Sequence, residues 1–226
     1  MIGIIGAMDQ EVNEFLKLML DVKEESHNGQ IFYLGKLEDQ AVVLSKSGVG
    51  KSLAAMSATL MVSNYNPALI INIGSAGALH KEFNVFDVIV AQRVAVADFD
   101  LTAFGYEKGF NQKRYSFECN LNLVDKLEAL KIDNVYVGDM VSSDTFINSE
   151  SLVNNILANY PTALCADMEA GSIAMVLDHL QIPFIVIRSI SDNVLASTDN
   201  KVDFEEYLVE ASYNSARVCQ ELIKSL

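Results

Sequence analysis

The sequence has few prolines and no long hydrophobic run, and both scarcities exclude classes of protein. Only 3 of the 226 residues are proline and 50% are hydrophobic, so the chain can bury a large core and is not of disordered composition. The longest apolar run, residues 68–73, is far shorter than the roughly 20 residues of a membrane-spanning helix. The first residues, MIGIIGAMDQE, contain no basic side chain, so we expect neither a secretory signal nor a membrane attachment.

Cysteines and basic residues are scarce as well. The three cysteines, Cys119, Cys165 and Cys219, are far apart and form no metal or redox motif, which is typical of reduced residues in a cytoplasmic protein. Acidic residues outnumber basic ones, 30 to 16, which gives a formal net charge of −14. A surface this acidic repels phosphate backbones, so we expect no nucleic-acid partner.

Short apolar runs alternate with stretches of helical period along the chain. The apolar runs predict strands at residues 2–6, 31–37, 41–46, 68–73, 85–96, 135–141, 163–168 and 184–190. The helical periods predict helices at residues 9–21, 50–65, 120–130, from Ser149 onward, 171–180 and 204–226, with residues 98–119 irregular. Such alternation predicts one α/β domain over residues 1–226, with a mixed, largely parallel central sheet flanked by helices.

Small and polar residues follow the predicted strands at their carboxyl ends, where sheets of this kind bind ligands. Three of these residues are carboxylates from distant parts of the chain, Glu11, Glu169 and Asp192. Capping of a helix explains Glu169 or Asp192 alone about equally well, and it explains Glu11 alone better, because acids are common in the first turn of a helix. Because all three fall on the same edge of the predicted sheet, we favour a functional site there.

Two glycine-rich segments have more than one interpretation. Residues 45–52, SKSGVGKS, approach the phosphate-loop pattern G-x-x-x-x-G-K-[ST], but Ser45 replaces the first glycine and no magnesium partner is evident. A tight turn that forms a backbone wall beside a ligand is the interpretation we favour. Residues 74–77, GSAG, fit either a bare turn or the close approach of another group to the backbone.

The sequence offers no evident nucleophile for covalent catalysis. His27, His80 and His179 have no acidic or nucleophilic partner in the pattern, so we interpret them as structural. No serine lies in a nucleophile elbow, and no cysteine is paired with a histidine. Covalent catalysis is therefore not favoured.

Seven segments, in order along nearly the whole chain, carry a resemblance to a known family. They are residues 3–11, 46–51, 72–77, 100–106, 144–148, 168–170 and 188–192. In these segments the sequence resembles the bacterial 5′-methylthioadenosine/S-adenosylhomocysteine nucleosidases of the purine nucleoside phosphorylase superfamily. The resemblance implies a nucleoside phosphorylase-like fold and an enzyme that uses no metal or other cofactor.

The activity that the resemblance implies is hydrolysis of the N-glycosidic bond of 5′-methylthioadenosine and S-adenosylhomocysteine. The products would be adenine and the 5-thio-substituted ribose, in methionine salvage and methyl-cycle recycling. 5′-Deoxyadenosine and aminofutalosine are further candidate substrates.

The resemblance gives each of the three carboxylates a different role. Glu11 would activate the attacking water, Glu169 would bind the ribose hydroxyls, and Asp192 would protonate N7 of the departing adenine. Phe146 would stack on the base while the backbone of Ile147 reads its edge. Supporting roles fall to Ser75 and Arg188 at the water, Met168 under the sugar, and Ser191 beside Asp192. The 5′-alkylthio group would contact Met8, Val49, Leu101, Phe104 and Phe204, and Ala7, Gly77 and Asp167 complete the implied binding set.

Physical chemistry supports this division of roles. Cleavage of the glycosidic bond builds positive charge on the ribose, which an anionic Glu169 stabilises. Adenine leaves poorly as an anion, so an acid such as Asp192 has to supply a proton. A phosphorylase needs cations around its phosphate, whereas Glu11 would repel that dianion, so hydrolysis is favoured over phosphorolysis.

Two other functions are compatible with parts of the pattern. A non-catalytic nucleoside-binding protein is opposed by the intact Glu11, Glu169 and Asp192. A phosphate-loop nucleotidase is opposed by Ser45 and by the missing magnesium partner.

The chain departs from the family pattern at three places. Asp167 stands where relatives have glutamate, and residues 193–203 are longer than usual. Residues 110–119 lack the prolines expected of a loop that, in relatives, helps to close the pocket of the neighbouring subunit. The resemblance implies a homodimer, and the apolar residues 56–61 fit either its interface or the core.

Overall fold

A ten-stranded sheet runs through the computed structural model, which describes residues 1–196 and 200–226. The strands are β1 (Ile2–Gly6), β2 (Leu20–His27), β3 (Gln30–Leu37), β4 (Gln40–Lys46), β5 (Leu69–Ala78), β6 (Val88–Val96), β7 (Ser116–Glu118), β8 (Val135–Ser142), β9 (Ala163–Asp167) and β10 (Phe184–Asp192). The helices are α1 (Asp9–Leu16), α2 (Lys51–Tyr65), α3 (Leu121–Ala129), α4 (Glu150–Leu157), α5 (Ala170–His179) and α6 (Asn200–Lys224), with a short 3-10 helix, η1 (Thr102–Phe104).

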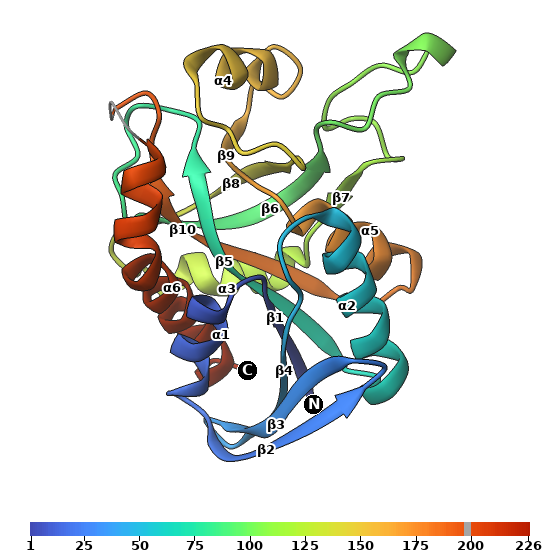
Figure 1. Ribbon diagram of the computed structural model, residues 1–226, viewed down its shortest axis with the longest axis vertical. Helices are drawn as coiled ribbons and strands as arrows, with labels where there is room; N and C mark the ends of the chain where they lie inside the picture. Colours follow the sequence, from blue (N-terminus) through green and yellow to red (C-terminus); the bar gives the residue numbers. More distant parts are fainter. Residues whose placement is uncertain (197–199) are drawn as a thin grey trace.

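Five of the strands close into a ring. The strand order is β10-β6-β8-β9-β5-β1-β4-β3-β2, and β10 also pairs with β5, so β5, β9, β8, β6 and β10 form a closed circuit. Parallel pairings join β1 to β4 and β5, β5 to β10, and β8 to β6 and β9, while the hairpins of β2, β3 and β4 are antiparallel. Helices α1, α3 and α6 lie on one side of this assembly and α2 and α5 on the other (Figure 1). The predicted mixed α/β fold flanked by helices is confirmed.

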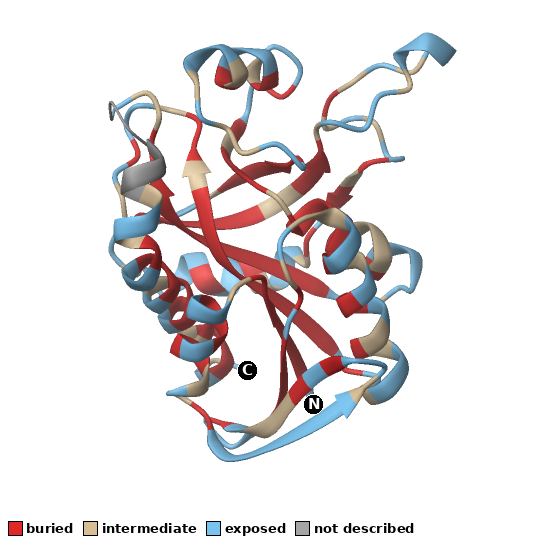
Figure 2. Cartoon of the chain, viewed as in Figure 1, coloured by how far each residue is buried: buried red, intermediate tan, exposed pale blue. Residues whose placement is uncertain are grey.

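The interior strands are apolar because both of their faces are covered. Residues of β1, β5 and β10 are almost all buried, and Figure 2 shows this buried sheet between exposed outer helical surfaces. Two helices begin as the sequence predicts: the side chain of Asn120 accepts from the Leu123 amide, and that of Ser149 accepts from the Leu152 amide. A second, smaller apolar cluster lies beneath α4.

One predicted helix is too long, and a strand was missed beside it. The expected helix at residues 9–21 ends at Leu16, and Leu20–His27 forms the edge strand β2. This strand carries the charged run Lys23-Glu24-Glu25 and is exposed along nearly its whole length (Figure 2). Because neither face of β2 is buried, it lacks the apolar alternation by which strands are recognised.

Other boundaries differ by a few residues, with one consequence for the site. The strand predicted at residues 68–73 continues through the glycine-rich residues 74–77 to Ala78, so these residues are not a turn. Strand β6 begins at Val88 rather than at residue 85, and the irregular stretch 98–119 contains η1 and β7. The segment 193–203, expected to be long, lies partly outside the described residues.

Two leucines provide a matched test of this burial pattern. Leu37 is 1% exposed at the end of β3, whereas Leu20 is 68% exposed at the start of β2. We expect Leu37→Ala to lower the free energy of unfolding by about 2–5 kcal/mol, because it leaves a cavity in the core. Leu20→Ala should change it by less than about 0.5 kcal/mol. Urea unfolding of both variants measures the difference, and equal losses would contradict the assigned burial.

Candidate active site

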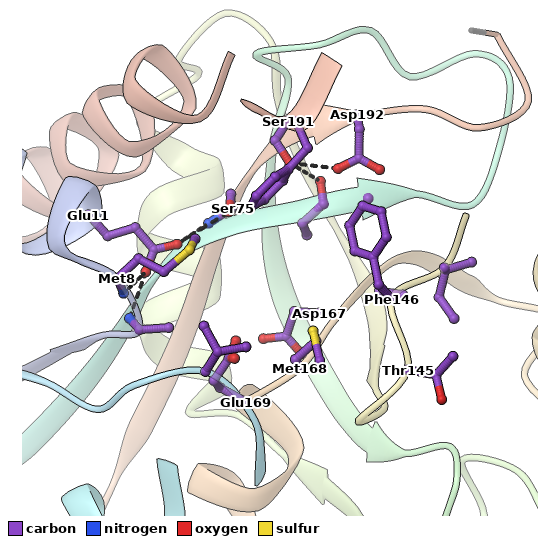
Figure 3. A pocket seen from close by; sticks show the side chains of 17 residues that line it. Met8, Glu11, Ser75, Thr145, Phe146, Asp167, Met168, Glu169, Ser191 and Asp192 are labelled. Carbon is purple, nitrogen blue, oxygen red and sulfur yellow. Dashed lines mark hydrogen bonds between the residues drawn. The ribbon is translucent and has the colours of Figure 1, made fainter. Parts of the chain in front are cut away.

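A cavity of about 210 Å³ opens where several strands end. In the view of Figure 3, Glu11 and Met8 lie on one side of it and Phe146 and Thr145 on the opposite side. Asp192 and Ser191 border the pocket above, and Asp167, Met168 and Glu169 border it below. The residues that line it are Ala7, Met8, Glu11, Val49, Ser75, Ala76, Gly77, Thr145, Phe146, Ile147, Ala166, Asp167, Met168, Glu169, Ser191, Asp192 and Phe204.

Glu11, in the first turn of α1, is held by four hydrogen bonds. Its Oε2 accepts from the amides of Ala7 (2.6 Å) and Met8 (3.1 Å), which caps the start of the helix. Its Oε1 accepts from the amide of Ser75 (3.0 Å) and from the Ser75 hydroxyl (3.2 Å). The capping interpretation is therefore correct but incomplete, because the same carboxylate also joins α1 to β5 at the pocket wall.

The glycines of β5 leave room for two carboxylates. A Cβ at Gly74 would lie 2.6 Å from Oε1 of Glu11, and the backbone there has a φ of 152°. A Cβ at Gly77 would lie 3.0 Å from Oδ2 of Asp192. Of the two interpretations of residues 74–77, close approach is the one that the structure supports, and the approaching groups are side chains of the protein itself.

Asp192 is the last residue of β10 and is 2% exposed. A register shift between Ile190 and Asp192 places the aspartate opposite Gly77 of β5. The hydroxyl of Ser191 donates to Oδ1 of Asp192 at 2.7 Å (Figure 3). The carboxylate of Asp192 therefore lies in the pocket wall.

Glu169 immediately precedes α5, but its side chain does not cap that helix. Its Oε1 instead accepts from the amide of Gly50 at 2.8 Å, in the loop between β4 and α2. Burial, and secondly the negative charge of Asp167, raise the pKa of Glu169 to about 8. A carboxyl group in this environment changes its charge close to neutral pH.

The side chain of Asp167, rather than that of Glu169, caps helix α5. Its Oδ2 accepts from the amide of Ala170 at 3.0 Å, and its Oδ1 accepts from the Ser142 hydroxyl. Two further bonds come from Arg188, whose Nη2 lies 2.7 Å from Oδ2. The shorter acid at this position therefore reaches α5, β8 and β10 at once.

Arg188 lies behind the pocket rather than in its lining. It is 1% exposed, and besides Asp167 its guanidinium donates to the carbonyls of Asn72 and Ile187 and to Oδ1 of Asn72. Burial alone would lower the pKa of Arg188, but the carboxylates of Asp167, Glu11 and Glu169 raise it. All five guanidinium N–H groups have acceptors within the protein.

The remaining wall of the pocket is apolar. The rings of Phe146 and Phe204 meet edge to face with centroids 5.7 Å apart, and Met8, Met168 and Val49 line the same cavity. Aromatic and thioether groups suit a flat, weakly polar ligand. The pocket thus combines an apolar surface with carboxylates on separate sides.

Most, but not all, of the residues predicted from the sequence come together here. Arg188, Leu101 and Phe104 do not line the pocket, and Phe104 is 78% exposed on η1. The structure adds lining residues that the sequence did not single out, Ala76, Thr145 and Ala166, and the buried partners Asn72 and Ser142. The signal that could have identified Asn72 is its position as a polar residue within an otherwise apolar strand.

The loop that resembles a phosphate-binding motif already holds carboxylates. The amide of Gly50 donates to Glu169, and the amide of Lys51 donates to Oδ1 of Asp144 at 2.8 Å. These are amides that a phosphate loop would present to a phosphate. The backbone-wall interpretation of this loop is therefore the one that the structure supports.

Three further observations concern metal-binding groups, membrane-spanning helices and cysteines. Within residues 1–196 and 200–226, no three His, Cys, Asp or Glu side chains are grouped to hold a metal ion. In the same residues, no helix is both long and apolar enough to cross a membrane. The three cysteines are free and buried, and burial raises the pKa of each thiol.

Comparison with known proteins gives consistent matches over the whole chain. Residues 1–226 match the sequence model of the "Phosphorylase superfamily". The chain is 41% identical to the 5′-methylthioadenosine/S-adenosylhomocysteine nucleosidase of Staphylococcus haemolyticus, with both sequences fully covered. Its structure superposes on the Streptococcus pneumoniae nucleosidase of that name, solved with the transition-state inhibitor MT-ImmA, with a TM-score of 0.92, 31% identity, and 99% and 98% of the two chains covered. The Colwellia psychrerythraea nucleosidase in complex with adenine gives a TM-score of 0.90 at 34% identity, with 100% and 95% covered.

The raised pKa of Glu169 predicts a pH-dependent stability. A carboxyl group with a pKa of about 8 in the folded state and about 4.5 when unfolded favours the folded state most at low pH. That contribution is lost as the pH rises from about 4.5 to about 8. Glu169→Gln, which cannot ionise, should therefore become progressively more stable than the wild type over this range.

Urea unfolding at several pH values measures this difference, which we expect to reach no more than a few kcal/mol above pH 8. The same substitution at the exposed Glu24 of β2 is the control and should leave the pH dependence of stability as in the wild type. A difference between Glu169→Gln and wild type that is constant with pH would contradict the assignment.

Proposed function

The chain belongs to the phosphorylase superfamily and, within it, to the 5′-methylthioadenosine/S-adenosylhomocysteine nucleosidases, and from this premise we propose that it hydrolyses the N-glycosidic bond of those two nucleosides. The products are adenine and the 5-thio-substituted ribose, and 5′-deoxyadenosine is a further substrate. We place the whole chain, residues 1–226, in one nucleosidase domain that acts in methionine salvage and methyl-cycle recycling. The observation that carries the proposal is the placement of Glu11, Glu169 and Asp192 on separate sides of one pocket (Figure 3).

Glu11 is the proposed base that removes a proton from the attacking water. Each carboxylate oxygen accepts two hydrogen bonds, but both donors to Oε2 are backbone amides, so we place the water at Oε1. There the weakest of the contacts is the Ser75 hydroxyl at 3.2 Å, which is free to rotate and hold the water against the carboxylate. The oxygen of the water then forms a bond to the anomeric carbon as the bond to N9 breaks.

Asp192 and Glu169 stabilise the two halves of the breaking bond. Asp192, held by Ser191, donates its proton to N7, so that adenine leaves as a neutral base. Glu169 accepts from the ribose hydroxyls, and its negative charge offsets the positive charge that develops on the sugar. The pKa of Glu169 in the protein alone is about 8. Hydroxyl donors of the ribose and the developing positive charge both favour the ionised form of this carboxyl group.

The charge of the pocket supports hydrolysis rather than phosphorolysis. Among the described residues that line it there is no lysine or arginine, whereas four of them are carboxylates. Arg188 lies close by, but acceptors within the protein use all of its N–H groups. A phosphate dianion would therefore meet negative charge without a cation to balance it.

The direct test is release of adenine from 5′-methylthioadenosine by the purified protein, without added phosphate or metal. We expect turnover, with a rate that does not change when phosphate is added. Absence of adenine would reject the nucleosidase and leave a nucleoside-binding protein. A rate that rises with phosphate concentration would indicate a phosphorylase.

Isosteric variants separate catalysis from binding in the same assay. Glu11→Gln and Asp192→Asn should each lower kcat by about 10²–10⁴-fold, since each removes a positioned base or acid. Both should keep the fold of the wild type, judged by circular dichroism and thermal unfolding. Near-normal adenine release by either variant would contradict its role.

We also propose that the protein is a cytoplasmic homodimer in which each subunit completes the 5′ pocket of the other. Segment 98–110, which contains η1, extends away from the sheet and helices at the upper right of Figure 1. Phe99 and Phe104 of this segment are exposed. Leu53 and Met56 on the outer face of α2 are exposed as well, whereas Met61 is in the core. Exposed apolar groups of this kind are typical of interfaces. In residues 110–119, by contrast, aromatic side chains pack within the subunit: Phe110 contacts Tyr160, and Tyr115 is buried.

Phe104 tests this assembly. Sedimentation should show a dimer, and Phe104→Asp should raise KM for 5′-methylthioadenosine about tenfold or more, because a charge enters an apolar contact. Leu20→Asp places the same charge on an exposed leucine of β2, away from the segment, and should leave KM unchanged. A wild-type monomer with full activity would contradict the shared pocket.

A further inference from the structure

Two neighbouring amides after β4 bind two carboxylates, one in a wall of the pocket and one directly before the opposite wall. The amide of Gly50 donates to Oε1 of Glu169, on the proposed ribose side. The amide of Lys51, the first residue of α2, donates to Oδ1 of Asp144. Asp144 is followed at once by Thr145 and Phe146, which form the opposite wall (Figure 3). One short loop therefore contacts both walls.

A closed set of contacts fixes the second of these attachments. The Lys51 ammonium forms an ion pair with Oδ1 of Asp98, directly after β6, and lies 3.7 Å from Oδ2 of Asp144. The other oxygen of Asp98, Oδ2, accepts from the amide of Asp144 at 3.0 Å. Each of Lys51, Asp98 and Asp144 thus contacts the other two. None of the three lines the pocket itself.

We propose that these three residues, called here the Lys51 clasp, are positioning residues that set the distance between the ribose wall and the base-stacking wall. The inference rests on the proposed function, because it assigns Glu169 to the sugar and Phe146 to the base. In a nucleoside the glycosidic bond holds the sugar and the base at a fixed distance. Both groups therefore bind well at once only if the two walls are correctly spaced. The clasp acts through Phe146 and has no contact with the reacting atoms.

The exposure of the clasp argues for positioning rather than for stability. The side chains of Lys51, Asp98 and Asp144 are 22%, 31% and 50% exposed, and ion pairs this accessible contribute little to the free energy of folding. The loop also lies close to Asp144. A Cβ at Gly50 would lie 3.2 Å from Oδ1 of Asp144, and the backbone of Gly50 has a φ of 95°. A side chain at position 50 would therefore press against the carboxylate of Asp144, and the backbone there favours glycine.

Asp144→Ala and Asp98→Ala test the clasp in the adenine-release assay. Each should raise KM for 5′-methylthioadenosine about tenfold, because Phe146 loses its fixed position, and change kcat by less than about threefold, because Glu11 and Asp192 are untouched. The double variant should raise KM no further than the larger single effect, since both residues act through the same attachment. Melting temperatures should stay close to that of the wild type.

Asp9→Asn is the matched control. It removes a charge from another exposed ion pair on the same rim, in which the Lys46 ammonium lies 2.7 Å from Oδ1 of Asp9, and should leave KM unchanged. Equal KM values for all four variants and the wild type would overturn the proposal. A decrease in kcat without a change in KM would also overturn it, as would increases in KM that multiply in the double variant. Failure of the wild type itself to release adenine would instead reject the proposed function.

Binding of adenine alone gives a second readout that does not depend on turnover. Adenine should raise the melting temperature of the wild type and of Asp9→Asn, and raise that of Asp144→Ala less at the same concentration, because ligand binding stabilises in proportion to occupancy. Equal shifts in the three proteins would overturn the proposal.

Discussion

The burial of carboxylates around one cavity is the constraint on which the arrangement of this protein depends. Glu11, Asp167, Glu169 and Asp192 are all nearly inaccessible, and in the part of the chain that the structure describes Arg188 is the one buried lysine or arginine. A buried charge without hydrogen-bond partners costs far more than the fold can supply. Backbone amides and hydroxyls at the strand ends therefore provide most of the donors, as the four bonds to Glu11 show.

This constraint explains why β5 has glycine at two positions and lies at the centre of the site. Gly74 adjoins the carboxylate of Glu11 and Gly77 adjoins that of Asp192, so one strand separates the proposed base from the proposed acid. The pairing of β5 with both β1 and β10 brings α1 and the end of β10 to this strand. A Cβ at either glycine would displace a carboxylate. The positions of the proposed base and acid therefore depend on the absence of a side chain at these two residues.

The sequence predicted the parts of this arrangement that depend on local pattern. Apolar strands, helix starts such as Asn120 and Ser149, and the carboxyl-end location of the acids all leave a periodic or positional signal. Strand β2 left no such signal, because an exposed edge strand buries neither face. The network of Asn72, Asp167 and Arg188 was also beyond prediction, since it joins three strands through contacts that only the folded sheet creates. For the same reason the sequence could not place Arg188 behind the pocket.

Carboxylates of nearly the same chemistry accept hydrogen bonds from different partners here, because different elements surround them. Glu11 receives four donors from α1 and β5, Asp192 receives a hydroxyl from its own strand, and Glu169 receives one amide while facing the charge of Asp167. Because burial raises the pKa of Glu169 to about 8, its charge responds to what enters the pocket, and a hydrogen-bond donor on the ligand would favour the ionised form. The Gly50 amide that donates to Glu169 lies in the loop that also holds Asp144, so the spacing of the pocket walls and the environment of Glu169 depend on the same few backbone amides.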